Sequence, residues 1–159
     1  MTTFHVVAVG RVRDAALRAA CDEYLRRIRR GARIDVREVP EAGRAGVTPA
    51  VTQRLEGERV RRATPGGALR VALTRVGRAQ TSEQFARLVG RWRDGARDVA
   101  FLLGGAHGLS DGLVRDADVA LSLSHLTLPH ELARLVLLEQ LYRAGTILRG
   151  EPYHKGRRP

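Results

Sequence analysis

Groups that can hydrogen-bond and carry charge gather near the C-terminus of the sequence. Arg143 is followed by a tail in which Tyr153, His154 and Lys155 occupy adjacent positions. Such a tail is unusual for a chain end that merely frays, and it could bind a ligand through hydrogen bonds and positive charge. Glu139 and Arg143 also stand four residues apart in the order that favours an ion pair on a helix surface, which explains both without any function.

Three loops provide a second group of sites where a ligand could bind. One follows Leu73 and contains Gly77, a second is the glycine-rich "GGAHG" of residues 104–108, and a third is the apolar "LSLSHLTLPHE" of residues 121–131. Adjacent glycines after a buried strand let the backbone approach a ligand, or simply form a turn. The sequence contains neither the dinucleotide-binding pattern G-x-G-x-x-G nor a phosphate-binding P-loop, so neither site is supported.

The elements that must position these loops alternate between strand and helix. Hydrophobic patterns predict five strands, at residues 4–9, 34–39, 69–74, 99–103 and 119–124. They also predict five helices. Three of these begin after the capping residues Asp14, Thr81 and Ser110, and the other two cover residues 49–63 and 130–148. Strands joined through helices imply crossover connections, hence an α/β fold with a mostly parallel sheet. No linker or repeat divides the 159 residues, so a single domain is expected. In such a sheet ligands bind at the carboxyl ends of strands.

The charge of the chain favours an anionic partner. It carries 28 basic and 17 acidic residues, a formal net charge of +11. Nucleic acid is the favoured partner, ahead of a membrane surface. Every basic residue except Lys155 is an arginine, and a compositional bias toward arginine is the alternative explanation. Arginines on one face of the first helix, from Arg18 to Arg30, are either a stripe facing RNA or a solvated surface.

Several classes of protein do not fit the composition. The longest apolar run is too short to span a membrane and the N-terminus lacks the features of a signal peptide, so a cytoplasmic location is expected. The single cysteine, Cys21, falls on the apolar face of a helix, where core packing explains it. The histidines lack the spacing of a zinc site, so we expect no metal.

Taken together, four blocks of sequence resemble the ribosomal large-subunit methyltransferase H family. They are "HVVAVGRVRD…CDEYLRRI", "DVAFLLGGAHGLS", "LSLSHLTLPHELARLVLLEQLYRA" and "GEPYHK". The resemblance implies a SPOUT-class methyltransferase with a C-terminal trefoil knot, whose cofactor-binding region covers about residues 99–155. It further implies methylation of N3 of a pseudouridine in 23S ribosomal RNA, S-adenosylmethionine as cofactor, and a homodimer acting on the assembled ribosome.

The resemblance also assigns residues to the two parts of the site. The cofactor pocket would be formed by Leu73, Gly104, Gly105, Leu123, Ser124, His125, Leu126, Thr127 and Leu128. An apolar loop rich in backbone groups suits adenine, and glycine backbone suits the methionine portion. Arg143, Tyr153 and His154 would lie beside the methyl group and orient the pseudouridine. Arg143 would stabilise the anion formed as N3 loses its proton, and either Tyr153 or His154 would accept that proton. His130 is expected to be structural or pocket-lining.

Two other functions remain open at this point. The first is a SPOUT methyltransferase that acts on transfer RNA. The second is an RNA-binding ribosome-assembly factor without catalytic activity, which would use only the basic surface. Of the departures from the family pattern, Ala106 and His107 are assigned no role, and the C-terminal extension 156–159 either lengthens the RNA contact or is a disordered end.

Overall fold

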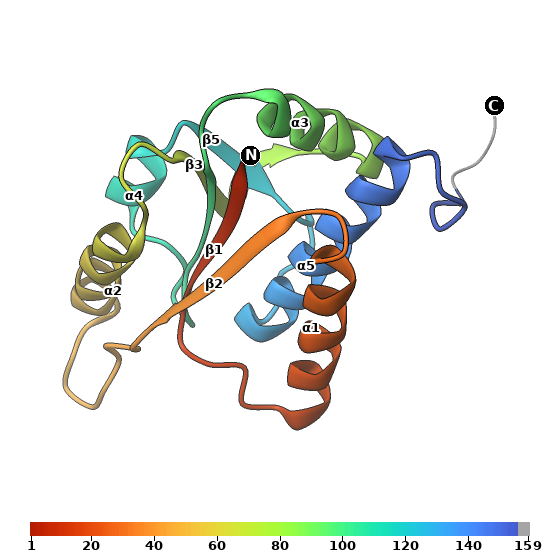
Figure 1. Cartoon of the computed structure of the whole chain (residues 1–159). Coiled ribbons are helices and arrows are strands. Elements are labelled where there is room, and N and C mark those ends of the chain that lie inside the picture. The colour runs from red at the N-terminus through yellow and green to blue at the C-terminus, as the bar shows by residue number, and fades with distance from the viewer. Residues whose placement is uncertain (156–159) are drawn as a thin grey trace.

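A five-stranded, wholly parallel sheet forms the centre of the computed structural model, which describes residues 1–155 (Figure 1). The C-terminal extension 156–159 and its expected RNA contact lie outside the described residues. The strands are β1 (Thr3–Val9), β2 (Arg33–Val39), β3 (Leu69–Ala79), β4 (Val99–Leu103) and β5 (Val119–Ser122). Their order across the sheet is β2-β1-β4-β3-β5, and each neighbouring pair is parallel. The expected α/β fold with a parallel sheet is confirmed.

Five helices cover the two faces of the sheet. They are α1 (Ala15–Ile28), α2 (Pro49–Ala63), α3 (Ser82–Asp94), α4 (Asp111–Asp116) and α5 (His130–Leu148). Helix α5 packs between α1 and α3 on one face, and α2 and α4 lie together on the other (Figure 1). The caps expected from the sequence are present, since Asp14, Thr81 and Ser110 each accept a hydrogen bond from the first turn of the following helix.

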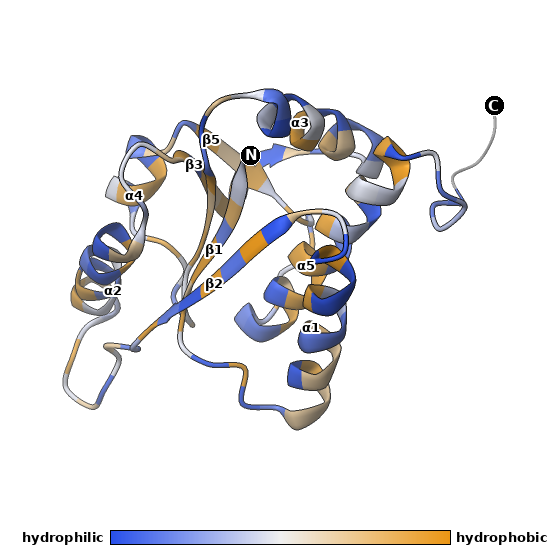
Figure 2. Ribbon diagram, viewed as in Figure 1, coloured by the Kyte–Doolittle hydropathy of each residue, from blue (hydrophilic) through white to orange (hydrophobic). Residues whose placement is uncertain are grey.

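Hydrophobic residues concentrate in the strands and on the helix surfaces that face them (Figure 2). All five residues of β4, the central strand, are buried, as its uninterrupted apolar sequence predicts. Cys21 is also buried in the core, which confirms its packing role, and burial raises the pKa of its thiol. A raised pKa favours the protonated thiol over the nucleophilic thiolate.

Strand β3 is longer than its hydrophobic pattern predicts, because its pairing with β5 resumes after a bulge. Leu73 and Arg78 both pair with Leu121 of β5, so the residues between them leave the ladder. Gly77 closes this bulge. A Cβ atom there would lie 2.5 Å from the carbonyl carbon of Leu121, so only glycine allows the two backbones to approach so closely. Strand β5 ends at Ser122, two residues earlier than predicted.

Candidate functional site

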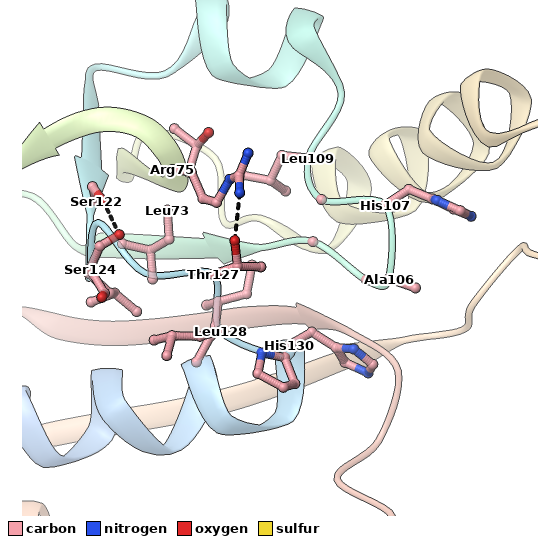
Figure 3. A pocket seen from close by; sticks show the side chains of 18 of the residues that line it. Leu73, Arg75, Ala106, His107, Leu109, Ser122, Ser124, Thr127, Leu128 and His130 are labelled. Carbon is pink, nitrogen blue, oxygen red and sulfur yellow. Dashed lines mark hydrogen bonds between the residues drawn. The ribbon is translucent and has the colours of Figure 1, made fainter.

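A cavity of about 800 Å³ opens at the carboxyl ends of β3, β4 and β5. Its volume lies in the usual range for small-molecule sites, about 300–1,000 Å³. Three segments form its walls: the β3 bulge, the glycine-rich loop after β4, and the loop between β5 and α5 (Figure 3). The start of α5, with His130 and Ala133, completes it. The three loops that the sequence marks as possible ligand sites therefore meet in one cavity.

The glycine-rich loop is a tight hairpin that only glycines can form. The Gly108 amide donates a hydrogen bond to the Gly105 carbonyl at 3.0 Å, and Gly108 has a positive φ of 75°. A Cβ atom on Gly104 would lie 2.2 Å from the carbonyl carbon of Gly108. The absence of side chains thus serves the close approach of backbone segments, and it leaves the wall of the cavity at residues 104 and 105 made of backbone.

The loop between β5 and α5 is held by its own hydroxyl groups. The Ser122 hydroxyl donates to the Ser124 carbonyl at 2.9 Å, and the Ser124 hydroxyl accepts from the Leu126 amide at 2.9 Å. Arg75 of the β3 bulge donates to the Thr127 hydroxyl at 2.6 Å, which joins two walls of the cavity (Figure 3). Leu126 is 75% exposed at the rim. The loop is apolar and is ordered by hydrogen bonds between residues close in sequence, yet part of its apolar surface is exposed to solvent in a single chain.

The cavity gathers eight of the nine residues expected to bind the cofactor. They are Leu73, Gly104, Gly105, Leu123, Ser124, Leu126, Thr127 and Leu128. The ninth, His125, belongs to the same loop but is exposed and does not line the cavity. His130 lines it, as expected. Apolar walls at Leu73 and Leu128 with backbone groups at the glycines fit an adenosine with a methionine portion.

Sequence reasoning marked the loop after Leu73 but did not assign its individual residues to the cavity wall. Thr74, Arg75 and Val76 line the cavity as part of the β3 bulge, whereas the sequence pattern predicted that the strand ends at residue 74. It also missed the contribution of α2, whose Gln53 side chain donates to the His107 carbonyl at 2.6 Å. The only signal for the bulge was Gly77. Nothing in the polar sequence of α2 marks it as a support for the glycine-rich loop.

The three residues expected to act on the substrate form a cluster around Glu139. Arg143 donates to Glu139 through Nε at 2.9 Å and to His154 Nδ1 through Nη1, with 3.1 Å between the two nitrogens. The Tyr153 hydroxyl donates to Glu139 at 3.1 Å, and the Arg143 guanidinium lies over the Tyr153 ring, 4.8 Å from its centre. The structure thus brings Arg143, Tyr153 and His154 together, and it confirms the ion pair of Glu139 with Arg143.

Contacts with α1 and α3 fix the tail in this position and set its ionisation. The Tyr24 and Tyr153 hydroxyls are 3.2 Å apart, and His154 Nε2 lies 2.8 Å from the Glu83 carboxylate. Burial, with the adjacent Tyr24 and the Glu139 carboxylate, raises the pKa of Tyr153 well above its ordinary value. The hydrogen bond from His154 lowers the pKa of Glu83. Tyr153 is therefore a hydrogen-bond donor rather than a base at neutral pH.

The cluster does not reach the cavity within one chain. None of Arg143, Tyr153 and His154 lines the cavity. Ala133, the last residue of α5 in its wall, precedes Arg143 by ten helical residues, which corresponds to about 15 Å along the axis. The expectation that these three residues lie beside the transferred methyl group is therefore not met by a single chain.

The described residues show neither a metal-binding cluster nor a membrane-spanning helix. Within residues 1–155 no group of three His, Cys, Asp or Glu residues is placed to hold a metal ion, and no helix there is long and apolar enough to cross a membrane. Arg26 and Arg27 of α1 both pair with Glu23, while Arg18 of α1 is exposed, as are Arg29 and Arg30, which follow the helix. The surface of α1 is thus partly neutralised.

Comparisons with known proteins agree on one family. A family model described as "Predicted SPOUT methyltransferase" matches residues 2–154. "Ribosomal RNA large subunit methyltransferase H" of Bordetella petrii is 44% identical over 151 residues, covering 94% of this chain and 97% of its own. The protein of the same name from Sorangium cellulosum is 50% identical over 149 residues, covering 93% and 96%.

Solved structures show the same fold at low sequence identity. The tRNA (m1G37) methyltransferase from Aquifex aeolicus matches with a TM-score of 0.57 at 13% identity, covering 100% of this chain and 77% of its own. TrmJ from Z. mobilis matches with a TM-score of 0.56 at 15% identity, covering 100% and 73%. At such identities the likeness concerns the fold alone.

Proposed function

The chain belongs to the SPOUT methyltransferase family, and within it to the ribosomal RNA large subunit methyltransferase H proteins, and from this membership we propose that it methylates N3 of a pseudouridine in 23S ribosomal RNA. The cofactor in this proposal is S-adenosylmethionine, which supplies an activated methyl group on a sulfonium. The observation that carries the proposal is the cavity, where loops from three strands present apolar side chains and bare glycine backbone.

The protein's own residues would act on the cofactor by enclosing it. Leu73, Leu123 and Leu128 offer an apolar slot for an adenine ring, and the backbone of Gly104 and Gly105 leaves space for a methionine portion. The hydrogen bond from Arg75 to Thr127 ties the β3 bulge to the opposite wall. Positioning of the methyl group for in-line transfer would account for most of the rate, because the sulfonium is already reactive.

The tail residues would act on the nucleobase. The Arg143 guanidinium is suited to stabilise the negative charge that develops when N3 loses its proton. Because its raised pKa keeps Tyr153 protonated, we assign it the role of hydrogen-bond donor. Proton acceptance is assigned to His154 Nδ1, whose lone pair becomes free when Arg143 turns from it to the nucleobase. His154 is already oriented by Arg143 on one ring nitrogen and by Glu83 on the other.

A homodimer is part of the proposal because one chain does not bring the tail to the cavity. On α5, Leu132, Val136 and Arg143 follow one another at intervals of four and seven residues, which places them on one side of the helix. Leu132 and Val136 belong to neither core cluster of the described residues. A second copy packed on this side would cover their apolar surface and the rim residue Leu126, and could bring its own tail to the cavity.

The proposed path of the chain through residues 99–155 is a trefoil knot. Its support is the membership of the SPOUT family and the strand order, in which β4 lies between β1 and β3 while β5 lies at the edge beside β3. We also propose that residues 1–159 form a single domain. A continuous main-chain trace in an experimental structure tests the knot, and an unthreaded path would contradict it.

Mapping the modification by mass spectrometry tests the substrate. Ribosomal RNA from a strain lacking the gene should contain the pseudouridine without its methyl group, and the purified protein with S-adenosylmethionine should restore the methyl group on ribosomes. Unchanged ribosomal RNA in that strain would refute the proposed substrate. The protein would then be tested on transfer RNA, and calorimetry without cofactor binding would favour the non-catalytic assembly factor.

A further inference from the structure

Glu56 is a buried carboxylate that the proposed reaction does not use. It lies on α2, and only 5% of its surface is exposed. Within residues 1–155 the hydrogen bond that its side chain accepts is a long one from the Ala42 amide, 3.4 Å. A carboxylate removed from water without a paired cation is costly to fold around, so a stability role explains it poorly.

The carboxylate lies directly behind the wall of the cofactor cavity. Gly105 lines that cavity, and a Cβ atom on Gly105 would lie 2.9 Å from Oε2 of Glu56 and 3.0 Å from Cγ1 of Val9. The Glu56 carboxylate therefore occupies the space that a side chain at residue 105 would need. No side chain at residue 105 stands between this charge and a ligand in the cavity.

The charged groups around Glu56 leave it without a partner of its own. Those that face it are Glu41 from the β2–α2 loop, Arg59 from the next turn of α2, and His107 from the glycine-rich loop. Arg59 directs its guanidinium to the carbonyls of Pro40 and Glu41, at 2.8 and 3.0 Å. His107 points away from the other labelled cavity residues (Figure 3). A cation inside the cavity would meet an unneutralised negative charge.

We propose that Glu56 is a specificity-determining residue of this cavity, whose carboxylate selects ligands that carry positive charge in their methionine portion. The inference rests on the proposed function, since S-adenosylmethionine carries a sulfonium and an ammonium group there. Low polarity around a buried carboxylate strengthens its attraction to such a cation across a few ångströms. Burial also raises the pKa of Glu56, so acid should remove the attraction.

Calorimetry with three ligands that carry two, one and no cationic groups tests the proposal. S-adenosylmethionine carries the sulfonium and the ammonium, S-adenosylhomocysteine only the ammonium, and methylthioadenosine neither. Glu56→Gln should lower the affinity for S-adenosylmethionine by about tenfold or more, and the affinity for methylthioadenosine should stay within about twofold. An equal loss for all three ligands, or no loss for any, would overturn the proposal, and the behaviour of S-adenosylhomocysteine identifies which cation is sensed.

The matched control is Glu58→Gln on the same helix. Glu58 carries the same charge but is about half exposed and pairs with Arg54 at 3.4 Å, so its loss should leave all three affinities unchanged. A wild-type protein that binds none of the ligands contradicts the proposed function itself. One that binds S-adenosylmethionine equally well with Gln at position 56 contradicts only the role of Glu56.

A measurement on the wild-type protein keeps the test independent of how the variant folds. The ratio of the affinities for S-adenosylmethionine and methylthioadenosine should fall as the pH is lowered from neutral to about 4, the ordinary range of a glutamate, because protonation removes the Glu56 charge. A ratio that stays constant over this range would overturn the proposal.

Discussion

At the scale of single residues, the contacts of Arg143 indicate that it serves methyl transfer and not cofactor binding. Its guanidinium reaches Glu139, His154 and the ring of Tyr153, and it does not line the cofactor cavity. We expect Arg143→Ala to lower single-turnover methylation of ribosomes by about 10²-fold or more, because the developing anion loses its cation. Cofactor affinity, measured by calorimetry, should stay within about twofold. Loss of cofactor binding in this variant would show that Arg143 belongs to the cavity instead.

Glu56 illustrates how a site can weaken the fold that carries it. Since burial raises its folded pKa, the stability it contributes is fully present below the unfolded pKa and is lost as pH rises through the folded pKa. Glu56→Gln should therefore raise the free energy of unfolding of the cofactor-free protein at pH 8, and should raise it much less at pH 4, where the carboxyl group is protonated in the folded protein. Denaturant titrations at the two pH values measure this. A variant that is less stable at both would show that the carboxylate has a structural role.

At the scale of elements, α2 supports the cavity from behind. Gln53 holds the His107 carbonyl at 2.6 Å, and Gly57 packs close to the Ser110 hydroxyl, so one side of α2 supports the C-terminal end of the glycine-rich loop and the cap of α4 that follows it. Gln53→Ala should weaken cofactor binding by roughly fivefold, the equivalent of about 1 kcal/mol for one hydrogen bond. Arg54→Ala, which removes only an exposed ion pair with Glu58, should leave it unchanged. Equal effects in the two variants would contradict a specific role for Gln53.

The elements themselves were largely predictable, and their irregularities were not. The five strands and five helices of the described residues follow from hydrophobic periodicity and capping residues, and the unbroken apolar run of β4 predicts its burial. The β3 bulge is invisible to such patterns, because it depends on how Leu73 and Arg78 share one partner in β5. His125 is a second case: its place in a motif assigned it to the cavity, but its side chain is exposed and does not line the cavity. A motif identifies a loop, whereas packing decides which side chains of the loop face inward.

At the scale of the whole molecule, the motif assignment overlooked the separation between cavity and tail. Motifs indicated both groups of residues, but the helix predicted at 130–148 already places Arg143 ten residues, or about 15 Å, beyond Ala133, the last residue of α5 that lines the cavity. The same helix carries Leu132 and Val136 on the side of Arg143, outside the core clusters of the described residues. Completion of the site by a second copy would explain both observations, and would explain why so many positions of α5 are apolar.

Mixing two inactive variants tests whether the site is shared between two chains. Arg143→Ala retains the cavity, and Thr127→Trp should block it with a bulky ring at an exposed wall position while retaining the tail. If each active site combines one cavity with the tail of the second copy, random pairing makes about half of the dimers mixed, with one of two sites intact, so methylation should recover to about a quarter of the wild-type rate. The readout is single-turnover methylation after joint refolding, with each variant refolded alone as the control and sedimentation to verify dimers. If mixing gives no recovery although dimers form, each chain completes its own site, and the tail must then move along α5 to reach the cavity beside it.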